Sequence, residues 1–173
     1  GCEFIVCDFR GYGRSEGVPT LKTTLIDAST IYCYLRDNKI LKKNVCVMGR
    51  SLGSASAIEL CARFSKIACC IIESGYADPI PLVERRGLKV TNITAAENAL
   101  FSNSEKIRLV KCPILIMHGE MDSLISPEEA KLNYKNASSI HKKLAILEGV
   151  GHNNIMTAQD NRSEEHTSEL QSQ

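Results

Sequence analysis

Long hydrophobic runs and runs of one charge are both missing from this sequence. The longest uninterrupted apolar segment covers residues 67–72, far short of the roughly 20 residues that a helix needs to cross a bilayer. The 21 basic and 20 acidic residues leave a net charge of +1, so no feature favours a nucleic acid or an anionic membrane surface as a partner. We therefore expect neither a transmembrane segment nor a nucleic-acid partner.

The eight cysteines lack the paired spacing that zinc sites use. No Cys-x-x-Cys occurs, Cys2 and Cys7 are too far apart, and Cys69 and Cys70 are adjacent. A free cysteine within or beside an apolar run behaves as a small hydrophobe, and this describes Cys7, Cys46, Cys69, Cys70 and Cys112. We expect reduced thiols, a cytoplasmic location and no bound metal.

The composition indicates one globular domain, because 43% of the 173 residues are hydrophobic and 24% are charged. The chain has no initial methionine and no secretory segment, and it enters an apolar run at residues 4–8, so we expect it to begin inside a domain. Residues 162–172 resemble the conceptual translation of a sequencing adapter. We therefore expect the domain to cover residues 1–161 and residues 162–173 to be an artefactual tail, with no role for His166.

Five short apolar runs predict strands, at residues 4–8, 45–48, 69–73, 114–117 and 144–147. They are continuously apolar rather than alternating, which is typical of a parallel sheet buried on both faces. Helices are expected between them. An apolar stripe predicts one from residue 20 to 38, small residues another at 54–64, and Ser126 before Pro127 a third. The pattern predicts an α/β domain of parallel βαβ units.

One connection between strands is unusually long. It holds 39 residues between Glu73 and Pro113, with Pro79, Pro81 and a helix-compatible stretch at residues 94–101. A lid or binding loop and a plain surface excursion are both compatible with this length.

The run at 45–48 leads through Gly49-Arg50-Ser51-Leu52-Gly53 into the predicted helix. Strand, Gly-x-Ser-x-Gly and helix together form a nucleophile elbow, which predicts Ser51 as a nucleophile. We expect that a Cβ at either glycine would collide with neighbouring backbone, while the serine has strained backbone geometry. The Leu52 N–H is the expected oxyanion donor, and the second donor would come from a loop absent from this chain.

A serine hydroxyl needs a base in hydrogen-bonding reach and a third group to orient that base. Asp122 follows the fourth apolar run and His152 follows the fifth, so the chain order is Ser51, Asp122, His152, as expected for this kind of elbow. Glu73 and Asp78 are the rival acids. We expect a structural role for His118, a solvated His141, and an Asp8 side chain bonded to local backbone amides.

Five motifs together resemble the α/β-hydrolase superfamily, in particular its BEM46-like and serine aminopeptidase S33-like members; they lie at residues 8–17, 49–53, 73–76, 118–122 and 151–153. The resemblance covers about residues 3 to 160. It makes residues 4–8 the fourth of eight strands, so that the chain would contain the last five strands of a mostly parallel sheet. In the family pattern the third strand lies between the fourth and the fifth. Without it, an open slot would separate residues 4–8 from residues 45–48, unless those two segments pair directly.

The resemblance implies a serine hydrolase that cleaves ester, thioester or amide bonds of a small-molecule or acylated substrate through an acyl-enzyme, without a cofactor. A carboxylesterase or acyl thioesterase is the first expectation; a peptidase, an acyltransferase or a non-catalytic binding protein on the same fold is the alternative. We expect Tyr12, Tyr76 and the insertion 78–108 to shape the substrate pocket. Arg50, where relatives often carry another residue, is expected to point away from the hydroxyl and to leave the mechanism untouched.

Overall fold

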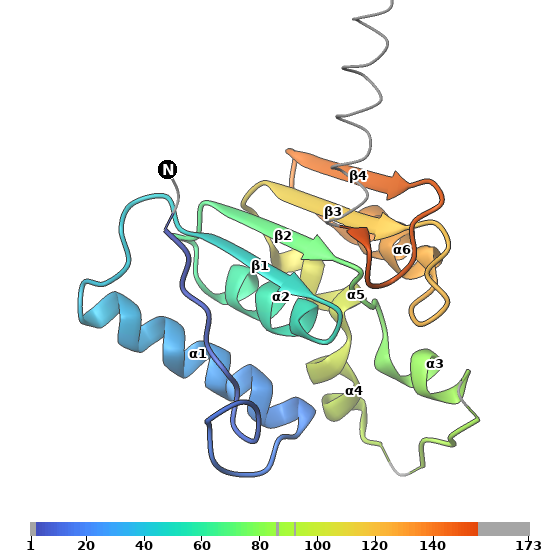
Figure 1. Ribbon diagram of the computed structural model, residues 1–173, viewed down its shortest axis with the longest axis horizontal. Helices are drawn as coiled ribbons and strands as arrows, with labels where there is room; N and C mark the ends of the chain where they lie inside the picture. Colours follow the sequence, from blue (N-terminus) through green and yellow to red (C-terminus); the bar gives the residue numbers. More distant parts are fainter. Residues whose placement is uncertain (1–2, 86, 92, 156–173) are drawn as a thin grey trace, which may run out of the picture.

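Four parallel strands form one sheet in the described part of the chain (Figure 1). The computed structural model describes residues 3–85, 87–91 and 93–155, so the expected tail at 162–173 lies outside it. The strands follow chain order across the sheet as β1 (Cys46–Arg50), β2 (Cys69–Glu73), β3 (Ile114–Gly119) and β4 (Lys142–Leu147). Every neighbouring pair is parallel, which confirms the βαβ prediction.

The helices are α1 (Leu21–Asp37), α2 (Gly53–Arg63), α3 (Pro79–Glu84), α4 (Ala95–Phe101), α5 (Asn103–Lys106), the 3-10 turn η1 (Ile107–Leu109) and α6 (Pro127–Asn136). Of these, α1, α2, α4 and α6 lie where the local patterns predict them, whereas α3, α5 and η1 were not predicted. Thr20 begins α1 with a capping box, because its hydroxyl accepts from the Thr23 N–H and the Thr23 hydroxyl accepts from the Thr20 N–H. Ser126 caps α6, whose first turn contains Pro127 and two glutamates. None of the described helices is both long and apolar enough to cross a membrane.

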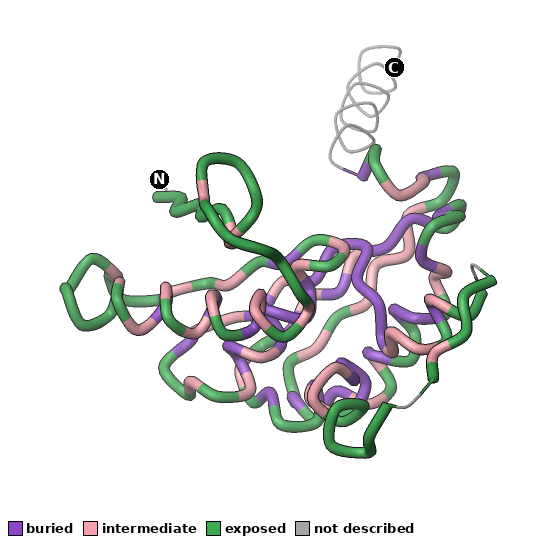
Figure 2. Tube along the Cα trace, turned by 90° about the horizontal axis from the view of Figure 1, so that it is seen from below, coloured by how far each residue is buried: buried purple, intermediate pink, exposed green. Residues whose placement is uncertain are grey.

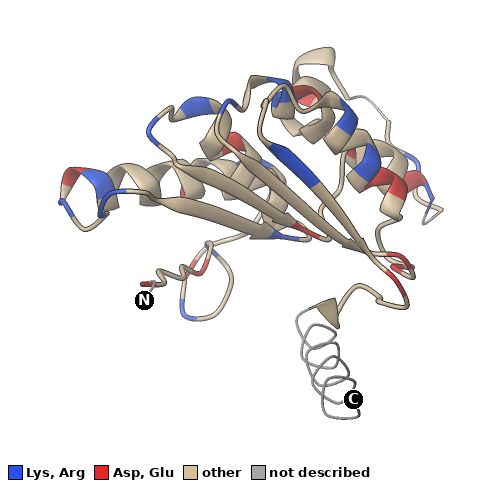
Figure 3. Ribbon diagram, turned by 90° about the horizontal axis from the view of Figure 1, so that it is seen from above, with Lys and Arg blue, Asp and Glu red and all other residues tan. Residues whose placement is uncertain are grey.

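The main core lies between the sheet and the helices that cover one of its faces (Figures 1 and 3). The inward side chains of β2 and β3, among them Cys70, Ile72, Ile114 and Ile116, are buried against α2 and α6. On the other face Met48 is about half exposed, and the outward residues of β2 and β3 are mostly only partly buried. The expectation of a sheet buried on both faces is therefore wrong for the described residues, because the helices that contact the sheet pack on a single side.

Residues 4–8 do not form the predicted first strand. They run as irregular chain that is mostly exposed (Figure 2). The residues Phe4 and Val6 are 88% and 90% exposed. A strand needs a neighbour for its backbone hydrogen bonds, and no described residue pairs with this segment. The expected five strands are therefore four here, and residues 4–8 and β1 do not pair directly.

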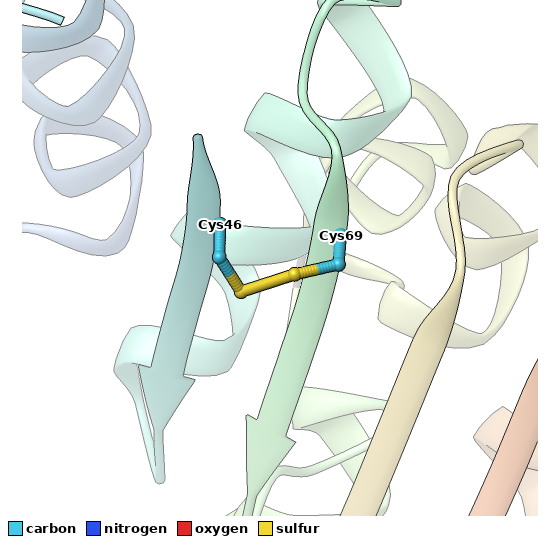
Figure 4. The surroundings of a disulfide bond; sticks show 2 residues. All are labelled: Cys46 and Cys69. Carbon is cyan, nitrogen blue, oxygen red and sulfur yellow. A yellow bond between two sulfur atoms is a disulfide. The ribbon is translucent and has the colours of Figure 1, made fainter. Parts of the chain in front are cut away.

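The cysteines depart from expectation at one place. Cys46 and Cys69 form a disulfide between β1 and β2 (Figure 4), which corrects the prediction of reduced thiols. The parallel register sets these two residues directly opposite each other, with 4.7 Å between their Cα atoms, a distance that allows the bond. The other described cysteines are free, and hydrogen bonding to Cys70 together with burial raises the pKa of the Cys61 thiol.

The long connection between β2 and β3 is built from α3, α4, α5 and η1. Leu82, Leu100 and Phe101 from this segment pack around Tyr76 in a second apolar cluster. Asp78 accepts hydrogen bonds from the hydroxyls of Ser102 and Ser104, which ties the end of the segment back to its beginning. The connection is therefore a folded insertion whose apolar side chains pack with Leu25, Ala55 and Ile125 from the rest of the domain.

Candidate active site

Ser51 lies in the turn directly after β1, in the geometry of a nucleophile elbow. Its φ of 52° is in the left-handed region, and its N–H donates to the Glu73 carbonyl at 2.9 Å. A Cβ on Gly49 would come within 2.3 Å of the Gly53 carbonyl oxygen, so only glycine fits there. Gly53 differs from the prediction, because a Cβ on it would meet no heavy atom within 4 Å. Of the two glycines in the motif, only Gly49 has no room for a side chain.

His152 connects Ser51 to Asp122. The His152 Nε2 atom lies 3.1 Å from Ser51 Oγ, and Nδ1 lies 2.7 Å from Asp122 Oδ2. An ionised carboxylate only accepts hydrogen bonds, so Nδ1 carries the proton and a neutral ring leaves Nε2 free to accept from the serine hydroxyl. This arrangement can remove the hydroxyl proton and hold the resulting imidazolium beside a carboxylate.

The Asp122 carboxylate is fully buried and held by several donors. Its Oδ1 atom accepts from the backbone N–H groups of Leu124 and Ile125, each at 2.9 Å, and the His118 Nε2 atom lies 3.2 Å from Oδ2. His118 Nε2 also lies 2.8 Å from the Ile125 carbonyl, so it carries a proton there as well. The buried His118 thus supports the acid, in keeping with its expected structural role.

The two rival acids have other partners. Glu73 is buried and pairs with Arg50, while Asp78 accepts from Ser102 and Ser104. His141 is exposed, as expected. The expectation for Asp8 is wrong, since no described backbone amide donates to its carboxylate and the Ser15 hydroxyl donates to its carbonyl instead.

The loops after β3 and β4 are docked on each other, which brings Asp122 to His152. The Met121 N–H donates to the Val150 carbonyl at 2.8 Å, and the Glu120 N–H donates to the Leu147 carbonyl at 2.9 Å. A Cβ on Gly119 would lie 2.3 Å from the Val150 carbonyl oxygen. The sequence reasoning missed this glycine, although its place at a strand end beside the predicted acid was a visible signal.

Leu52 occupies the position before the first residue of α2. Among the described residues, none accepts a hydrogen bond from its backbone N–H. An N–H at a helix N-terminus suits a developing negative charge. Leu52 can therefore serve as the oxyanion donor that the sequence predicts.

The two tyrosines expected at the substrate pocket differ. Tyr76 is 0% exposed within the second apolar cluster, and burial raises the pKa of its hydroxyl. Its side chain offers no surface to a ligand, which corrects the expectation. Tyr12 is about half exposed in the loop before α1, and its contribution to a pocket stays a prediction.

Arg50 contacts the loop that contains His152. Its Nη2 atom donates to the His152 carbonyl at 2.9 Å and to Asn153 Oδ1 at 2.7 Å, and its Nε atom lies 3.2 Å from Glu73 Oε1. These contacts are additional to the expected orientation, and the expectation that Arg50 leaves the mechanism untouched is not tested by them. Its partners lie 23 and more than 100 residues away in the sequence, so no local pattern indicated them.

Comparisons with known proteins agree with this geometry. The family model described as serine aminopeptidase, S33 matches residues 76–158. Protein bem46 of Schizosaccharomyces pombe is 31% identical in an alignment of 154 residues that covers 86% of this chain and 51% of that protein. Human alpha/beta hydrolase domain-containing protein 17B is 30% identical over 155 residues, or 89% of this chain and 51% of that protein. The chain thus spans about half the length of these curated relatives.

Solved structures share the fold at lower identity. A Pyrococcus furiosus esterase, Pf2001, superimposes with a TM-score of 0.72 at 20% identity, over 94% of this chain and 67% of that one. An acylaminoacyl peptidase of Pyrococcus horikoshii gives 0.60 at 15% identity, over 79% and 24%. The parallel sheet, the order of the strand-end motifs and these matches lead to one conclusion: the chain has the fold of an α/β-hydrolase.

Proposed function

We propose that this protein is a serine hydrolase in which Ser51, His152 and Asp122 form the catalytic triad. The observation that carries the proposal is the continuous hydrogen-bonded path from the Ser51 hydroxyl through the imidazole to a buried carboxylate, with steps of 3.1 and 2.7 Å. Such a path raises the nucleophilicity of a hydroxyl that is otherwise a weak nucleophile near neutral pH.

In the proposed reaction, His152 Nε2 takes the Ser51 proton as Oγ attacks the substrate carbonyl carbon. The Leu52 N–H donates to the oxygen as it becomes negative, and the protonated imidazole then gives its proton to the leaving group. The acyl group remains on Oγ as an ester. A water molecule, deprotonated by His152, attacks this ester and releases the acid, and the proton returns to Ser51.

The first candidate substrate class is a carboxylic ester or acyl thioester. The fold neighbour Pf2001 is described as an esterase, and activated esters need the least help at the leaving group. A peptidase is the second candidate, because the family model that matches residues 76–158 is described as a serine aminopeptidase. The two candidates share the acyl-enzyme and differ only in the leaving group.

The test is steady-state hydrolysis of a p-nitrophenyl ester, an acyl thioester and an aminoacyl p-nitroanilide by purified protein and by Ser51→Ala. We expect ester or thioester turnover, and a loss of about 10⁴-fold or more in kcat in the variant. The exposed Ser65 supplies the matched control Ser65→Ala, which should keep wild-type rates. Turnover that is equal in Ser51→Ala and the wild type would refute the proposal, and turnover of the anilide alone would select the peptidase.

A further inference from the structure

Arg50 lies at the end of β1 directly opposite Glu73 at the end of β2. The two side chains share the face of the sheet that the helices leave open, where paired residues of neighbouring strands interact. Glu73 is 3% exposed in its side chain and Arg50 is 45% exposed. A buried carboxylate is costly unless it is paired, so Glu73 fixes the Nε end of the guanidinium.

The other end of the guanidinium reaches the segment that contains His152. One nitrogen, Nη2, donates both to the His152 backbone carbonyl at 2.9 Å and to Asn153 Oδ1 at 2.7 Å. Guanidinium is planar and its N–H groups point in fixed directions. Once Nε is held by Glu73, the direction of Nη2 is set and so is the position of the carbonyl that it binds.

Arg50 and Ser51 are adjacent in the chain, so this contact joins the nucleophile turn to the base across a sequence separation of more than 100 residues. The His152 ring contacts Ser51 Oγ, and the His152 backbone carbonyl accepts a hydrogen bond from Arg50. The position of the imidazole relative to Oγ therefore depends on both contacts.

We propose that Arg50 is a positioning residue, oriented by Glu73, that holds the His152 backbone so that Nε2 stays within hydrogen-bonding reach of Ser51 Oγ. This inference rests on the proposed function. A displacement of about 1 Å at a reacting group can cost about 100-fold in rate. Loss of Arg50 should lower kcat by about 10- to 100-fold and leave KM within about threefold, since Arg50 itself contacts no reacting atom.

The test compares Arg50→Ala with Arg50→Lys on a p-nitrophenyl ester, with Arg63→Ala as the control for an exposed arginine. Removing Arg50 alone leaves Glu73 buried and unpaired, so folding could suffer for a reason unrelated to positioning. The double variant Arg50→Gln/Glu73→Gln removes both charges together and avoids this. We expect the kcat loss in the double variant as well, an intermediate kcat in Arg50→Lys, and partial recovery of Arg50→Ala by millimolar guanidinium, which a general loss of stability would not show.

A second readout does not depend on turnover. The proton that His152 Nδ1 shares with Asp122 should give a downfield proton NMR signal in the wild type, and it should broaden or disappear in the folded double variant. A wild-type kcat in that variant with an unchanged signal would overturn the inference. A raised KM at unchanged kcat would also overturn it, because Arg50 would then bind substrate. A wild-type protein that lacks turnover but shows the Arg50-dependent signal would refute the proposed function alone.

Discussion

Replacing Asp122 by asparagine changes one atom of the buried carboxylate and reverses the hydrogen bond to His152. The asparagine oxygen can keep the two backbone donors, Leu124 and Ile125, that Oδ1 binds at 2.9 Å. Its NH₂ group then occupies the place of Oδ2, 2.7 Å from His152 Nδ1. That ring nitrogen must now accept, so Nε2 carries the proton and cannot take another from the serine hydroxyl.

The expected loss follows from this change of tautomer. In a serine protease triad the same substitution lowers kcat by about 10⁴-fold, which corresponds to about 5.4 kcal/mol of activation free energy. A smaller effect on stability is expected too. One N–H of the new amide donates to His152, and the other faces the His118 Nε2 proton across the 3.2 Å contact. This second N–H is a buried donor without an acceptor, which costs about 1 to 3 kcal/mol.

The assay is stopped-flow and steady-state hydrolysis of a p-nitrophenyl ester by Asp122→Asn, with rates normalised to folded protein. Glu128→Gln, a change of the same kind at an exposed side chain of α6, is the control and should be silent. The reasoning is refuted if folded Asp122→Asn keeps a kcat within tenfold of the wild type. Glu73 or Asp78 would then have to be reconsidered as the acid.

Three further predictions concern the framework of the site. Replacing Cys46 by serine removes a disulfide whose cysteines are 23 residues apart in the sequence. The free energy of unfolding should then fall by about 3 kcal/mol, and the thermal midpoint should fall by about 6 to 12 °C. An unchanged midpoint in calorimetry would contradict the pairing. Gly49→Ala should unfold the elbow or abolish ester hydrolysis, whereas Gly53→Ala should be tolerated, because only the first Cβ meets backbone; equal effects of the two would contradict the geometry. The hydrogen bond from Arg10 lowers the pKa of Asp27 below the ordinary range of an aspartate. This carboxylate therefore stabilises the fold above the ordinary aspartate pKa, and the stabilisation is lost as the pH falls through the lowered pKa. Acid titrations of stability should be shallower in Asp27→Asn, and superimposable titrations would contradict the contribution.

Local features of the sequence predicted most of the elements of the sheet and its helices. The run 69–73 is β2 to the residue, and the helix expected between Thr20 and Asn38 is α1. Caps and apolar periodicity act within one turn of chain, so they can be read without the fold. The order of the strand-end motifs also predicted that Ser51, Asp122 and His152 would meet, because parallel strands end at one edge of a sheet.

Features that depend on the register or on a neighbour could not be predicted in this way. The Cys46–Cys69 disulfide requires that these residues lie opposite each other, and one residue of slip would separate them. Residues 4–8 have the composition of a strand but no partner among the described residues. The Arg50 contacts join three strand ends that only the folded sheet brings together.

Covalent labelling measures the nucleophilicity of the Ser51 hydroxyl itself. A fluorophosphonate reacts with a serine only when a base takes its proton, so the proposed triad should give stoichiometric labelling that peptide mass spectrometry locates at Ser51. The reaction should be absent in Ser51→Ala, at least 100-fold slower in His152→Ala, and unchanged in Ser65→Ala. Labelling of the wild type at another serine, or equal labelling of wild type and Ser51→Ala, would contradict the account.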